Sequence, residues 1–123
     1  MIKRAAIYEL IKGAAQVPVY PDYIPQEVPL PAVAYTLVSA PDGLRTLDGG
    51  VTLQQHFWQL EILVNDRQEG DAIGERIRQL DGLQTDDFQR IEVAEPRDSP
   101  SSPDVTTKQS IVEIQTTNRR NRA

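Results

Sequence analysis

Two stretches of the chain repeat apolar residues at the spacing of an α-helix. In residues 2 to 14 the stripe consists of Ile7, Leu10, Ile11 and Ala14, and Gly13 is expected to end the helix. A second helix is predicted from about Gln68 to Leu80, with Asp66 as its cap and Glu69 completing a capping-box pattern. Gly70 and Gly74 share one face of this helix. They indicate close packing on a sheet, or alternatively a close contact with another subunit.

Four other stretches favour β-strands because they are apolar or alternate between apolar and polar residues. They are residues 32 to 39, 54 to 65, 87 to 95 and 108 to 118. The clearest is the second, in which Trp58, Leu60, Ile62 and Val64 occupy one face, so Trp58 is expected in the core.

The order of these elements is helix, two strands, helix, two strands, written αββαββ. It predicts an α+β fold with a four-stranded antiparallel sheet and both helices on one face. Such a fold is like a ferredoxin-like sandwich that has been circularly permuted.

Length and loop composition indicate a single α+β domain over residues 1–117. Residues 40–53 contain Asp-Gly turn signals and are expected to form a long mobile hairpin loop. Residues 96–107 are expected to form a Pro/Ser loop. Residues 118–123 have no apolar pattern and are expected to form a flexible basic C-terminal arm.

Five of the nine prolines lie between residues 17 and 35: Pro18, Pro21, Pro25, Pro29 and Pro31. Proline breaks helices and favours extended backbone. A disordered linker would be poor in large apolar residues, whereas this stretch contains Val19, Tyr20 and Ile24 among others. An ordered strap from the first helix to the first strand is therefore predicted.

Charge is unevenly distributed along the chain. The net charge is −5, but without Arg119, Arg120 and Arg122 there remain 10 basic and 18 acidic residues, a net −8 for residues 1 to 117. An acidic body is not suited to binding nucleic acid through phosphates. The chain lacks cysteine, which excludes disulfides and thiolate metal sites, and it has no apolar run long enough for a membrane span.

The residues offer little catalytic chemistry, so no enzyme activity, cofactor or metal is expected. His56 is the single histidine, and no Gly-x-Ser-x-Gly elbow, P-loop or HExxH motif is present. His56 is predicted to be a surface or edge-strand residue, and Asp86 and Asp87 to form a solvated turn. A small hydrolase using His56 with a carboxylate such as Asp87 remains a distant alternative.

Partner contacts are predicted where apolar or basic residues occur on loops and arms. The candidates are Tyr20, Tyr23, Leu44, Arg45, Leu47, Arg119, Arg120 and Arg122. Apolar residues on a long loop often become ordered when a partner binds. The arginines are suited to bind an acidic neighbour or DNA phosphate, or serve only as a solubilising tail. A basic arm on an acidic body favours head-to-tail self-association.

Nearly the whole chain, about residues 4 to 117, resembles the tail-completion or tail-terminator proteins of long-tailed bacteriophages. The resemblance lies in the stretch "VPVYPDYIPQEVPLPAVAYTLVS", the strand "FWQLEILVND" and the helix "EGDAIGERIRQLDG". It implies a homo-oligomeric ring, expected to be a hexamer, at the head-proximal end of the tail tube. The ring would stop tube polymerisation and dock the head–tail connector, with DNA passing through its lumen without specific binding.

The expected partners are then further copies of the chain, the tail tube protein and the connector or head-closure protein, with no membrane. The location would be the virion tail or neck, after assembly in the host cytoplasm. A neck, head-closure or connector-adaptor protein is the main alternative. An adaptor that uses its prolines as an SH3 ligand is disfavoured, because Pro18 and Pro21 have no basic residue nearby.

Overall fold

The first helix, α1, spans Arg4–Ala15 and is held by packing on the sheet. Its buried residues are Ile7, Ile11 and Ala15. Gly13 does not end it, contrary to expectation. Instead, Gln16 adopts a left-handed conformation with φ 59°, and its N–H donates to the carbonyl oxygen of Lys12 at 3.1 Å.

The structure is a computed structural model that describes residues 3–40, 44–45, 51–99 and 107–121.

The second helix, α2, spans Arg67–Arg78 and begins where the sequence predicts. Asp66 caps it by accepting a hydrogen bond from the backbone N–H of Gln68 at 3.1 Å. A Cβ added at Gly70 would lie 3.1 Å from the side chain of Val64, and one at Gly74 would lie 3.2 Å from Pro96. Both glycines therefore allow close packing within the domain.

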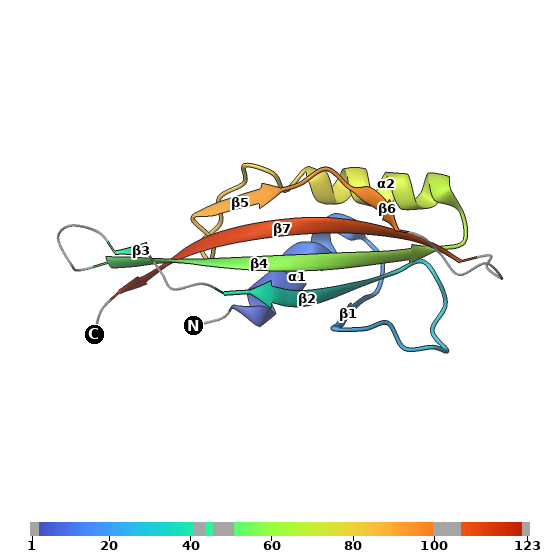
Figure 1. The fold of residues 1–123 in the computed structure, drawn as a ribbon, viewed down its shortest axis with the longest axis horizontal. Coiled ribbons are helices and arrows are strands. Elements are labelled where there is room, and N and C mark those ends of the chain that lie inside the picture. Colours follow the sequence, from blue (N-terminus) through green and yellow to red (C-terminus); the bar gives the residue numbers. More distant parts are fainter. Residues whose placement is uncertain (1–2, 41–43, 46–50, 100–106, 122–123) are drawn as a thin grey trace.

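Seven strands in the described part of the chain form one mixed sheet. Their bounds are β1 Val19–Pro21, β2 Ala32–Ser39, β3 Leu44–Arg45, β4 Val51–Val64, β5 Arg90–Val93, β6 Arg97–Ser99 and β7 Lys108–Asn121. The main path runs β1-β2-β4-β7-β5, while β3 pairs with β4 and β6 pairs with β7 (Figure 1). Strands β4 and β7 are in register over 14 residue pairs and form the centre of the sheet.

The predicted four-stranded antiparallel sheet is therefore wrong, and so is the αββαββ order. The proline strap contributes β1, which pairs parallel to β2 with Val19 opposite Val33. The two predicted loops contribute β3 and β6. These three strands are two or three residues long, and pairing with a neighbour, rather than an apolar pattern, makes them strands.

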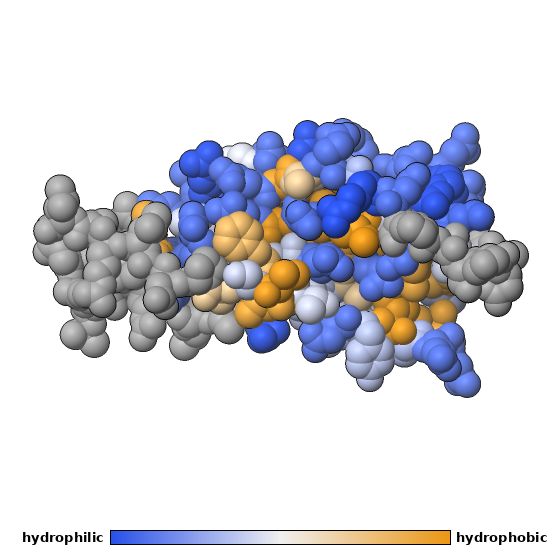
Figure 2. All heavy atoms as spheres, in the orientation of Figure 1, coloured by the Kyte–Doolittle hydropathy of each residue, from blue (hydrophilic) through white to orange (hydrophobic). Residues whose placement is uncertain are grey.

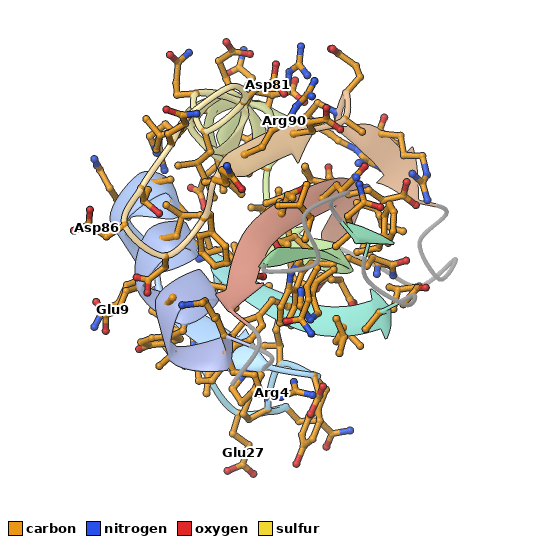
Figure 3. The ribbon with its side chains drawn as sticks, turned by 90° about the vertical axis from the view of Figure 1, so that its left-hand side faces the viewer. Arg4, Glu9, Glu27, Asp81, Asp86 and Arg90 are labelled. Atoms are coloured by element: carbon orange, nitrogen blue, oxygen red, sulfur yellow. The ribbon has the colours of Figure 1, made fainter. Side chains whose placement is uncertain are left out.

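The core lies between both helices and one face of the sheet. Residues that alternate along the strands fill it, including Val33 and Tyr35 on β2, Trp58, Leu60 and Ile62 on β4, and Val112 and Ile114 on β7. Trp58 is fully buried as predicted, and its indole N–H donates to the hydroxyl of Thr116 at 3.1 Å. Charged residues such as Glu9 and Asp86 point away from this core (Figure 3).

The β5 edge of the sheet is closed by the segment that follows α2. The side chain of Asp81 accepts from the N–H of Val93 at 2.8 Å, and Arg78 donates to the carbonyl oxygen of Val93. The N–H of Gly82, with φ 81°, donates to the carbonyl oxygen of Ile91 at 2.8 Å. These bonds occupy backbone N–H and carbonyl groups of β5 that could otherwise pair with another strand.

Three segments predicted as loops or a free arm contain strands in the structure. Within residues 40–53, β3 and the start of β4 are paired strands, and within residues 96–107 the segment Arg97–Ser99 is a strand. In the region predicted as a free arm, 118–123, residues 118 to 121 continue β7 opposite residues 51 to 54 of β4. Pairing with the long β4 strand supplies the order that an apolar pattern does not.

Candidate partner interface

The face of the sheet that points away from the helices carries a hollow with apolar walls. Val38 on β2 is 61% exposed and Phe57 on β4 is 36% exposed. They line a hollow of about 580 Å³ together with Ala94 and Gln115. Figure 2 shows this face, with hydrophobic side chains gathered over the centre of the strands among hydrophilic ones. We call it the open face.

Glutamates also lie on the open face. Glu92 and Glu113 line the hollow, and Glu61 lies on the same face between Ala34 and Ile111 in the strand register. Glu92 pairs with Arg90 at 2.6 Å and Glu113 with Arg97 at 3.3 Å. All four of these side chains are well exposed, so each ion pair contributes little to stability and can be rearranged by a partner.

At one end of the molecule, β3 and the adjoining ends of β4 and β7 extend beyond both helices (Figure 1). The register places Leu44 and Arg119 on either side of Leu53. It places Arg45 and Arg120 on either side of Thr52. We call this three-stranded extension, residues 44–45, 51–55 and 117–121, the arm. It is a larger unit than the C-terminal arm predicted from the sequence at residues 118–123.

The arm brings together four of the eight predicted contact residues, although they come from segments more than 70 positions apart in the chain. Leu47 and Arg122 lie outside the described residues. The two predicted tyrosines do not belong to the arm. Tyr20 lies on β1 and, with Tyr8 and Lys12, lines a shallow hollow, and Tyr23 follows β1 and is 72% exposed.

His56 is buried, contrary to the prediction of a surface or edge-strand residue. It lies on the core-facing side of β4, opposite Thr116, with its ring centroid 6.3 Å from that of Trp58. Burial lowers the pKa of His56 below its ordinary value, and the nearby side chain of Asn118 partly opposes this shift. Asp87, the carboxylate considered as its partner, instead forms an ion pair with Lys3 at 3.5 Å.

The described residues contain no group of three or more histidine, cysteine, aspartate or glutamate side chains placed to hold a metal ion. Within the same residues, no helix is both long enough and apolar enough to cross a membrane.

The open face was missed from the sequence, although one signal for it was present. Phe57 occupies a position of β4 that faces away from Trp58, among Gln55, Gln59 and Glu61. A large aromatic residue on the otherwise polar side of a half-buried strand is the kind of residue that protein interfaces favour.

The fold also occurs in an assembled particle. One solved structure similar to this chain is a chain from the "Virion of native gene transfer agent (GTA) particle". The two share a TM-score of 0.64 and 11% sequence identity, and the alignment covers 96% of this chain and 95% of that chain. At this identity the likeness shows a common fold. No protein-family model and no curated protein matches the sequence.

Proposed function

We propose that this chain is a structural protein of a phage-like particle and, within that particle, the terminator of the tail. Copies of the chain form a ring, with six as the expected number, on the head-proximal end of the tail tube. The ring stops polymerisation of the tube and provides the surface on which the head–tail connector docks.

The observation that carries this proposal is a match to a virion chain over almost the full length of both proteins. The resemblance of the proline strap, the β4 strand and the α2 helix to tail terminators supports the tail as the proposed position within the particle.

Two features of the described residues agree with a role in assembly. Val38 and Phe57 form an exposed apolar surface, which a partner can bury. His56 is buried with its ring beside that of Trp58, an environment that suits a packing role.

The charge of the chain agrees with a ring through which DNA passes. The net charge is −5, and it is −8 when the three C-terminal arginines are set aside. Fixed negative charge repels phosphate, so DNA would slide through such a ring without being held.

Deletion of the gene in the particle-producing strain tests the proposal. Electron micrographs of the lysate should show tails of uncontrolled length, and a plasmid copy of the gene should restore uniform tails. Tails of normal length with heads that leak DNA would instead assign the chain to the neck. Normal particles in the deletion strain would refute a role in assembly.

A further inference from the structure

We draw no further inference here: the strongest candidate, the hollow with apolar walls on the open face between Val38 and Phe57, carries none, because nothing in the described residues shows what covers it.

Discussion

Gly70 on α2 gives the sharpest test of how the helix packs on the sheet. Replacing a helical glycine by alanine stabilises an exposed site by up to about 1 kcal/mol, because alanine loses less backbone freedom on folding. At Gly70, however, the new Cβ would lie 3.1 Å from Cγ2 of Val64, which is buried, and 3.7 Å from the hydroxyl oxygen of Ser110. Ordinary carbon–carbon contacts are about 3.5–4.0 Å, so Val64 or the helix must shift.

Overpacking of this kind costs about 1–3 kcal/mol, which exceeds the gain in helix propensity. We therefore expect Gly70→Ala to lower the free energy of unfolding by up to about 2 kcal/mol after that gain is subtracted. The matched control is Gly13→Ala in α1, where nothing lies within 4 Å of the added Cβ, and it should raise the same quantity.

Urea unfolding followed by circular dichroism measures both variants against the natural chain. Equal slopes with shifted midpoints would report a change in stability alone. If Gly70→Ala is as stable as Gly13→Ala, the close packing between α2 and the sheet is refuted. If it is also impaired in self-association, the glycine face contacts another subunit instead.

Three further predictions concern the buried histidine, the buried tryptophan and the strap. Because the pKa of His56 is lowered in the folded chain, its protonation opposes folding; stability should fall below about pH 6.5 by up to about 1.4 kcal/mol per pH unit, and His56→Gln should remove this component. An unchanged pH profile in the variant would contradict the burial. Thr116→Val leaves the indole N–H of Trp58 without its partner and should cost about 1–3 kcal/mol in urea unfolding, whereas a cost near zero would show that the bond is unimportant. Limited proteolysis should spare residues 18 to 31, and rapid cleavage there would contradict an ordered strap.

The sequence predicts the helices well because their signals are local. The apolar stripe of α2 and its cap at Asp66 lie within a few residues of one another, and the structure has both. The fully buried position of Trp58 also follows from simple alternation along β4. The same alternation, extended two residues toward the N-terminus, also places His56 inside, where the structure has it.

The short strands could not be predicted, because their order comes from distant partners. β1 contains a proline, and β6 consists of Arg97–Ser99, so neither has an apolar pattern. They become strands by pairing with β2 and β7, which lie elsewhere in the chain. The ends of β4 and β7 likewise support each other, which orders residues 118 to 121 despite their polar sequence.

The candidate interface likewise has one part that the sequence predicts and another that depends on strand pairing. Individual residues of the arm were predicted as contacts from their exposed apolar or basic character. Their assembly into one extension depends on the register of β3, β4 and β7, which no local pattern reveals. The hollow was not predicted, because Val38 and Phe57 come together only through the pairing of β2 with β4.

We propose that this chain caps one end of a tail tube. Purified protein can be mixed with isolated tail tubes and imaged by negative-stain electron microscopy, with tubes alone as the control. A terminator should give one ring at a single end of each tube and no further growth of that end when tube protein is added. Tubes with bare ends, or protein bound along their length, would contradict it.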